Sequence, residues 1–246
     1  MTTDTPVFER PPKEIVDALA EIGSATTAGT LGKMGIRNPH FAGLRPYTMG
    51  KSICGPAVTL QFMPKREDVH LSDEYSSSPE RELHRTALIA AQAGDVVVVD
   101  ARGSMGSGVF GEMMLTYFKG KGGLGVVIDG CIRDYPYVQQ LDIGLWLKGT
   151  TPNFHTQTDV FPHAVNVPIA CAGVFVRPGD LIVGDDDGAV VVPIQMAQEV
   201  VEHASTKTDA ENFIRMKLAE GGDLRKYYPL TPEAQVEYEA WAKKKQ

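Results

Sequence analysis

The sequence has few cysteines, no long apolar run and no excess of basic residues, and each shortage argues against a class of protein. Its 246 residues include three cysteines, Cys54, Cys131 and Cys171, with no C-x-x-C pair. An odd number of widely spaced cysteines argues against a disulfide scaffold or a structural zinc site and is typical of buried thiols in a reducing compartment. No stretch approaches the ~20 apolar residues that a membrane-spanning helix needs.

The chain is acidic, with a formal net charge of −7. Nucleic-acid-binding proteins usually carry a basic patch, so we expect no nucleic-acid partner. The N-terminal MTTDTPVFERPP lacks the apolar segment of a signal peptide, and we therefore expect a cytoplasmic protein with no membrane partner. An acidic protein that acts on an anionic substrate must concentrate positive charge locally, which directs attention to individual arginines.

Hydrophobic periodicity predicts an α/β protein with a mixed sheet. Helical patterns cover residues 12–22, 26–33, 81–92, 112–119 and 194–220. Strand patterns cover 52–62, 93–100, 123–129, 145–149, 163–170 and 171–193. The four valines of AGDVVVVD suit a strand that is covered on both faces. No linker divides the chain, so we predict a single domain over 1–246, with a core at about 15–220 and a C-terminal extension at 221–246.

A glycine-rich segment, DARGSMGSGVFGEMM, contains a G-x-G-x-x-G motif between a strand pattern and a helix pattern. With Asp129 eighteen residues after Gly111, it has the form of a dinucleotide-binding fingerprint. A Rossmann loop begins directly at the strand end, whereas Gly106 lies six residues past Asp100, and too little β-α-β pattern follows. A dinucleotide site is therefore disfavoured. The glycines indicate instead either a loop with close backbone packing or an anion site at the start of the helix.

Gly111-Glu112 is followed, after twenty residues, by Arg133-Asp134. Together with HRTALIAAQAGDVVVVD, GVVIDGCIRD and PGDLIVGDDDGAVVVP, this motif resembles the RraA-like family over about residues 15–220. That family includes the class II 4-hydroxy-4-methyl-2-oxoglutarate / 4-carboxy-4-hydroxy-2-oxoadipate aldolases and the regulator of ribonuclease E activity A. The resemblance implies a β/β/α sandwich of the swivelling-domain type. It also implies a homotrimer or homohexamer with active sites at subunit interfaces.

The resemblance further implies a class II, metal-dependent pyruvate aldolase, which is a carbon–carbon lyase. Such an enzyme cleaves a 4-hydroxy-2-oxo acid by a retro-aldol reaction and releases pyruvate, with oxaloacetate decarboxylation as a side activity. The implied cofactor is Mg²⁺ or Mn²⁺, and the implied partner is a small-molecule 2-oxo acid. Carried over from the family, the metal ligand is Asp134, and the substrate-binding residues are Arg133, Gly111, Met113 and Met114, the last two through their backbone amides.

The residue types of the motif suit this chemistry by themselves. Mg²⁺ commonly uses one or two protein carboxylates and keeps several waters. A guanidinium such as that of Arg133 forks onto carboxylate oxygens, which a lysine does less well. The alternative for Arg133-Asp134 is a surface ion pair at the turn after a strand.

Two acidic positions of the implied catalytic set stay open. Glu112 stands where the strict aldolase pattern has aspartate, and its extra methylene suits a water-bridged role better than a direct ligand. The family also uses a glutamate near the C-terminus of a neighbouring subunit to hold water at the metal. Glu211 is the candidate here, although Thr208-Asp-Ala-Glu211 also has the form of a helix capping box.

The regulator members of the family lack the complete metal and substrate set. The presence of both Arg133 and Asp134 therefore favours an enzyme, with a non-catalytic regulator that binds a protein partner as the alternative.

Other parts of the chain carry expectations. Asp100 is expected to order the glycine loop, and GDDDG is expected to form a hairpin turn because it lacks EF-hand spacing. Residues 62–79 and the tail after Gly222 are expected to shape what binds beyond the pyruvate half of the substrate.

Overall fold

A computed structural model of the protein describes residues 5–66, 68, 82–155 and 158–244. Its contacts divide the chain into two compact units, Met1–Ala197 and Gln198–Gln246. The expected single domain with a core to about residue 220 stays a prediction. Most of the segment 62–79 lies outside the described residues, so its expected role in substrate recognition also stays a prediction.

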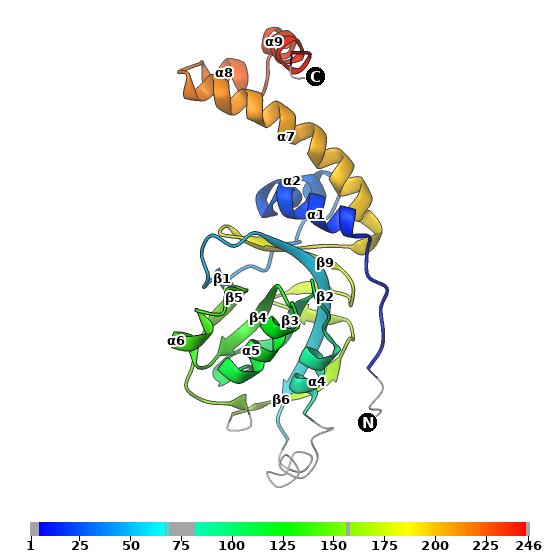
Figure 1. Cartoon of the computed structure of the whole chain (residues 1–246), viewed down its shortest axis with the longest axis vertical. Helices are drawn as coiled ribbons and strands as arrows, with labels where there is room; N and C mark the ends of the chain where they lie inside the picture. Colours follow the sequence, from blue (N-terminus) through cyan, green and yellow to red (C-terminus); the bar gives the residue numbers. More distant parts are fainter. Residues whose placement is uncertain (1–4, 67, 69–81, 156–157, 245–246) are drawn as a thin grey trace. The chain divides into compact units, whose positions relative to one another are not determined.

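The first unit is built on an eight-stranded mixed sheet (Figure 1). Its strands follow the order β1 (Arg45–Pro46), β5 (Gly144–Thr150), β4 (Gly125–Ile132), β3 (Val96–Gly108), β2 (Ile53–Pro64), β9 (Leu181–Asp185) and β10 (Gly188–Val192), with β6 (Val160–Val165) also paired to β2. Strands β2, β3, β4 and β5 are parallel to one another, whereas β1, β6, β9 and β10 pair antiparallel. The predicted α/β class with a mixed sheet is confirmed.

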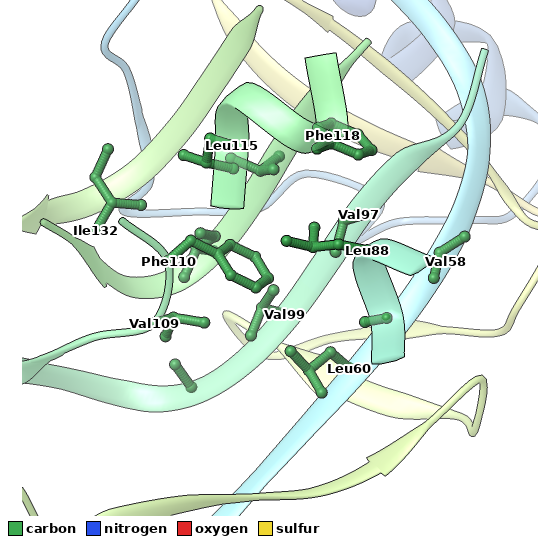
Figure 2. Packing of buried hydrophobic residues seen from close by; sticks show 14 of the residues in the cluster. Val58, Leu60, Leu88, Val97, Val99, Val109, Phe110, Leu115, Phe118 and Ile132 are labelled. Carbon is green, nitrogen blue, oxygen red and sulfur yellow. The ribbon is translucent and has the colours of Figure 1, made fainter. Parts of the chain in front are cut away.

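The parallel strands are covered on both faces, as the valine run predicts. Helices α4 (Leu83–Ala90) and α5 (Glu112–Gly120) lie over one face, where Val97 and Val99 join the core shown in Figure 2. On the opposite face, Val96 and Val98 belong to a second core with residues of the hairpin β7 (Ile169–Cys171) and β8 (Val174–Val176). Alternate side chains of one strand therefore enter two cores, which explains an apolar run without polar alternation.

The glycine segment differs from its prediction. We expected a loop after Asp100, but β3 continues to Gly108, with register shifts between Val99, Ser104 and Gly108. The strand continues because Ser104 still pairs with Gly130 and Gly108 with Cys131, with extra residues between these pairs as in a β-bulge. The GDDDG turn is confirmed as a hairpin, because β9 and β10 pair antiparallel on either side of it.

Two helices and a buried ion pair secure the N-terminal part of the first unit. Helices α1 (Lys13–Ile22) and α2 (Ser24–Lys33) confirm the predicted helical patterns. Just before α1, Arg10 Nε and Nη2 donate to the two carboxylate oxygens of Asp95 at 3.0 and 2.6 Å. Asp95 is fully buried at the start of β3 and also accepts the Gln92 amide at 2.8 Å. This pair fixes the N-terminal segment to the residue that directly precedes the central strand β3.

The second unit contains helices α7 (Ala197–Ala219), α8 (Leu224–Tyr227) and α9 (Pro232–Ala242). Phe213, Tyr227 and Ala234 form its small core, and Thr231 caps α9 by accepting the Ala234 amide at 3.3 Å. Because α7 runs without a break through Thr208, the capping-box interpretation of 208–211 is wrong. Among the residues that the structure describes, none of the helices combines the length and hydrophobicity of a membrane-spanning segment.

The buried Arg10–Asp95 pair generates a stability prediction. Arg10→Ala leaves a fully buried carboxylate without its charged partner, and breaking such a pair typically costs about 3–5 kcal/mol. Lys13→Ala is the matched control, because the Lys13–Asp17 pair is exposed and pairs of that kind contribute about 0–1 kcal/mol. Urea unfolding followed by circular dichroism measures both. Equal losses in the two variants would contradict the importance of burial at Asp95.

Candidate functional site

The two halves of the Gly111-Glu112 … Arg133-Asp134 motif meet where β3 and β4 end. Backbone pairing between the two chain segments continues past the last strand residues. The Val109 amide donates to the Cys131 carbonyl at 2.9 Å, and the Arg133 amide donates to the Phe110 carbonyl at 3.0 Å. This continued ladder places the start of α5 directly beside Arg133 and Asp134, although twenty residues separate them in the sequence.

The close approach leaves no room for a side chain at Gly108, and at Gly111 a side chain would displace those of Asp134 and Arg133. A Cβ on Gly111 would lie 2.6 Å from Asp134 Oδ2 and 2.8 Å from Arg133 Nε. A Cβ on Gly108 would collide with the Asn153 carbonyl oxygen and would lie 3.0 Å from Arg133 Cβ. At Gly106 the nearest atom would be 3.9 Å away, so that position has room. Close backbone packing therefore accounts for the G-x-G-x-x-G motif, and binding of a dinucleotide is not needed to explain it.

Asp134 has an unusual backbone conformation that turns its carboxylate toward α5. Its φ of 59° is left-handed, a region that aspartate adopts more readily than most residues. Asp134 Oδ2 accepts the Glu112 amide at 3.2 Å and lies 3.7 Å from Arg133 Nε. The side chain is 42% exposed, so solvent and solutes reach it. Asp134 also precedes the short helix α6 (Tyr135–Val138).

Positive charge is concentrated around this carboxylate. The Arg133 side chain is 41% exposed, and its guanidinium carbon lies 5.9 Å from the ring centroid of Phe154. Glu112, Met113 and Met114 form the first turn of α5, where backbone amides have no acceptor within the helix. Free amides and the helix dipole favour an anion. Arg133 and the start of α5 can therefore hold a carboxylate from two sides.

The donor set also fits a hard divalent cation. Asp134 and Glu112 supply carboxylate oxygens, which Mg²⁺ and Mn²⁺ prefer. In the described part of the chain, no group of three or more His, Cys, Asp or Glu side chains could hold a metal ion by itself. A cation at Asp134 would complete its shell with water and ligand oxygens, which is the usual arrangement for Mg²⁺.

A buried histidine pair lies next to this site and could not be found from the sequence. The rings of His84, on α4, and His155 are 4.3 Å apart, and both side chains are 3% exposed. Burial, followed by the charges of His155 and Arg85, lowers the pKa of His84 well below its ordinary value. Burial, followed by the charges of Arg133 and Arg85, lowers the pKa of His155 to about 4. No shared motif or periodicity links the two positions.

Asp100 and Glu211 are the two remaining residues with a predicted role. Asp100 is 6% exposed, and its Oδ1 accepts the Arg102 amide at 3.0 Å, which suits the expected role of ordering the glycine segment. Burial raises the pKa of the Asp100 carboxyl, and that hydrogen bond partly offsets the shift. Glu211 lies on α7 in the second unit, and its catalytic role stays a prediction.

Comparisons with known proteins agree on one relationship. A family profile described as Aldolase/RraA matches residues 13–191. A Halalkalibacterium halodurans protein named "Putative 4-hydroxy-4-methyl-2-oxoglutarate aldolase" is 34% identical over 164 residues, which cover 67% of this chain and 70% of that protein. The crystal structure of Streptomyces coelicolor RraAS2 is described as that of an unusual member of the RNase ES inhibitor RraA protein family. Its sequence is 44% identical to this chain, and the two structures align with a TM-score of 0.76. The alignment covers 85% of this chain and 100% of the RraAS2 chain. An uncharacterised Pseudomonas syringae protein is 26% identical with a TM-score of 0.75, covering 90% of this chain and 100% of its own.

The motif glycines can be tested against each other. Gly108→Ala should lower the free energy of unfolding by about 1–3 kcal/mol, because the new Cβ would overlap the backbone carbonyl oxygen of Asn153. Gly106→Ala is the matched control and should change it by less than about 0.5 kcal/mol, because the position has room. Urea denaturation compares the two variants. A loss of equal size at Gly106 would show that backbone flexibility, rather than close approach, requires these glycines.

Because His155 is buried as a neutral imidazole, we expect the free energy of unfolding to decrease as the pH falls. Between about pH 6.5 and 4, His155 binds a proton in the unfolded chain but stays neutral in the folded protein, so stability is complete above that range and decreases as the pH falls. For a pKa of about 4, His155 alone would account for about 3 kcal/mol. His155→Phe keeps a ring but cannot titrate. Urea unfolding at pH 7, 5.5 and 4 should therefore show a shallower loss in this variant, and an identical loss would contradict the burial of a neutral imidazole.

Proposed function

The chain belongs to the RraA-like (Aldolase/RraA) family, and from this premise we propose that it is a metal-dependent lyase that splits a 4-hydroxy-2-oxo acid and releases pyruvate. One observation carries the proposal: the first turn of α5, the Arg133 guanidinium and the Asp134 carboxylate lie together at one partly exposed point. A 2-oxo acid offers an anionic carboxylate and an adjacent carbonyl oxygen. The anion matches the arginine and amides, and the two oxygens together match a cation held by Asp134.

In this proposal, Arg133 and the start of α5 bind the substrate. The guanidinium forks onto the carboxylate of the pyruvate half, and the amides of Met113 and Met114 donate to the same group. Gly111 keeps the space between these donors open. Arg133 packs over Phe154, which limits the directions that the guanidinium can take and so reduces the entropy lost on binding.

The cofactor in this proposal is Mg²⁺ or Mn²⁺, held by Asp134 with Glu112 beside it. A bound ion would polarise the 2-oxo group and stabilise negative charge on the enolate oxygen. The left-handed backbone of Asp134 turns its carboxylate toward the start of α5 before any ligand arrives. Such preorganisation is the main contribution that a protein makes to stabilising a developing charge.

The bond changes balance without an external oxidant or reductant. The C4 hydroxyl gives its proton to a base, the C3–C4 bond breaks, and the C4 carbonyl product leaves. The electron pair of that bond becomes the enolate of pyruvate, which takes up a proton at C3. Glu211, acting from a neighbouring subunit of a trimer or hexamer, is the proposed group that supports the base. Loss of CO2 from oxaloacetate forms the same enolate, which supports decarboxylation as a side activity.

A second candidate function, a regulator that binds a protein partner, also has specific support. The Streptomyces coelicolor relative, which is 44% identical to this chain, is described as belonging to an RNase ES inhibitor family. Large apolar side chains around the start of α5 and α6 are also exposed: Met113 at 70%, Tyr117 at 47% and Tyr137 at 63%. Such a surface suits protein contact. The intact Arg133-Asp134 pair favours the lyase.

The decisive measurement is pyruvate release, coupled to lactate dehydrogenase, from 4-hydroxy-4-methyl-2-oxoglutarate and from oxaloacetate. We expect turnover with Mg²⁺ and its loss with EDTA. Asp134→Asn keeps a side chain that tolerates the left-handed backbone but removes the charge, and it should lower kcat/KM by at least about a hundredfold. Asp142→Asn is the matched control, because Asp142 is exposed, is also left-handed and lies outside the site; it should retain wild-type turnover.

The outcomes separate the two functions. Release from oxaloacetate alone would retain the site and reject the tested aldol substrate. If the folded protein releases pyruvate from neither substrate, and both wild type and Asp134→Asn slow RNA cleavage by a ribonuclease E-type enzyme, the regulator function replaces the lyase.

A further inference from the structure

Three charged side chains stand in a row beneath the glycine segment. Val99 pairs with Ile128, and Ile128 pairs with Leu147. The regular register ends at these three residues. The next residues are Asp100, Asp129 and Lys148, and their interactions show that they lie side by side: Lys148 pairs with Asp129, and Asp129 acts electrostatically on Asp100. Two residues earlier on the same face are Val98, Val127 and Trp146, all members of one apolar core. The row therefore marks where the apolar face ends at the carboxyl edge of the sheet.

The row places two buried carboxylates beside one ammonium group. Asp100 is 6% exposed and Asp129 is 7% exposed. Lys148 Nζ lies 2.9 Å from Asp129 Oδ1. Burial raises the pKa of the Asp100 carboxyl, and the negative charge of Asp129 raises it further. Like charges on adjacent strands destabilise a sheet, so the lysine offsets a repulsion that its removal would leave uncompensated.

The glycine segment rests on this row. The Arg102 amide donates to Asp100 Oδ1 at 3.0 Å. Gly103 has a φ of 70° and lies so close to Lys148 that a Cβ would be 2.7 Å from Nζ. Farther along, the Met105 carbonyl accepts a bond from Cys131 Sγ at 3.5 Å. Residues 102–107 thus cross the charged row in an irregular register, and the strand pairs with β4 at Ser104–Gly130 and again at Gly108–Cys131.

The other end of this segment is the candidate site itself. The Gly108 amide donates to the Asn153 carbonyl at 3.0 Å, and the ladder through Val109 and Phe110 leads directly to Gly111. Gly111 lies directly against the Arg133 and Asp134 side chains. A displacement at Gly103 therefore reaches the site through a short stretch that is bonded to β4 along its length.

We propose that Asp129 and Lys148 are positioning residues, whose ion pair sets the path of residues 102–107 and thereby the placement of Gly111 against Arg133. Neither residue needs to touch the substrate. The kinetic consequence rests on the proposed lyase function, whereas the path of the segment can be measured without it.

The test uses Lys148→Met in the full-length protein, with Lys148→Arg as the conservative variant and Lys13→Met as the matched control. Native-state hydrogen exchange by mass spectrometry should show roughly tenfold faster exchange for peptides covering 101–111 in Lys148→Met. Its kcat/KM for pyruvate release should fall by up to about a hundredfold, because a misplacement of about 1 Å at a reacting group can cost that much. Lys148→Arg should restore both readouts, and Lys13→Met should leave both unchanged.

A second variant covers the case in which Lys148→Met does not fold. Asp129→Asn combined with Lys148→Met removes both charges of the ion pair and also the repulsion between Asp129 and Asp100. Because the ion pair is still missing, the same peptides should still exchange faster. Wild-type exchange in a folded variant overturns the proposal, and so does faster exchange with unchanged kcat/KM in an active protein. If wild type releases no pyruvate while the variants exchange faster, the lyase function fails and the positioning of the segment stands.

Discussion

The site depends on one constraint: the backbone pairing of β3 with β4 continues beyond both strands. The bonds from Val109 to Cys131 and from Arg133 to Phe110 are main-chain bonds, so they tolerate many side chains but little displacement. They bring a helix start and an arginine-aspartate pair together at the carboxyl edge of a parallel sheet, where ligands commonly bind in α/β proteins. The lack of room for a side chain at Gly108, which lies against Asn153 and Arg133, is a consequence of this close approach.

Burial on both sides of the sheet gives this junction its rigidity. The valines of β3 alternate between two cores, so the strand cannot shift along its axis without moving side chains in both. Dense cores of this kind transmit small displacements rather than absorbing them. The charged row at Asp100, Asp129 and Lys148 lies where this rigid part of the sheet ends and the glycine segment begins.

The sequence predicted the main helices and the buried strands of the sheet, but it could not predict contacts between residues that lie far apart in the chain. Periodicity predicted α1, α5 and the buried strands because side-chain alternation records which faces are covered. It missed the extension of β3 through glycine, since glycine carries no side-chain pattern. The contact between His84 and His155 joins a helix to a distant loop, and no local pattern encodes it. The capping box at 208–211 was wrong because local capping chemistry cannot tell an N-terminus from the interior of a longer helix.

Asp134 already occupies the first free amide of α5 with its own carboxylate. The protein therefore carries an internal competitor for its anion site, and a simple anion must displace that carboxylate to reach the Glu112 amide. A cation that drew the carboxylate away would release the amide, so cation and anion would each raise the affinity for the other by the same factor. Such reciprocal coupling would make the site respond weakly to either ion alone and strongly to a ligand that brings both charges together.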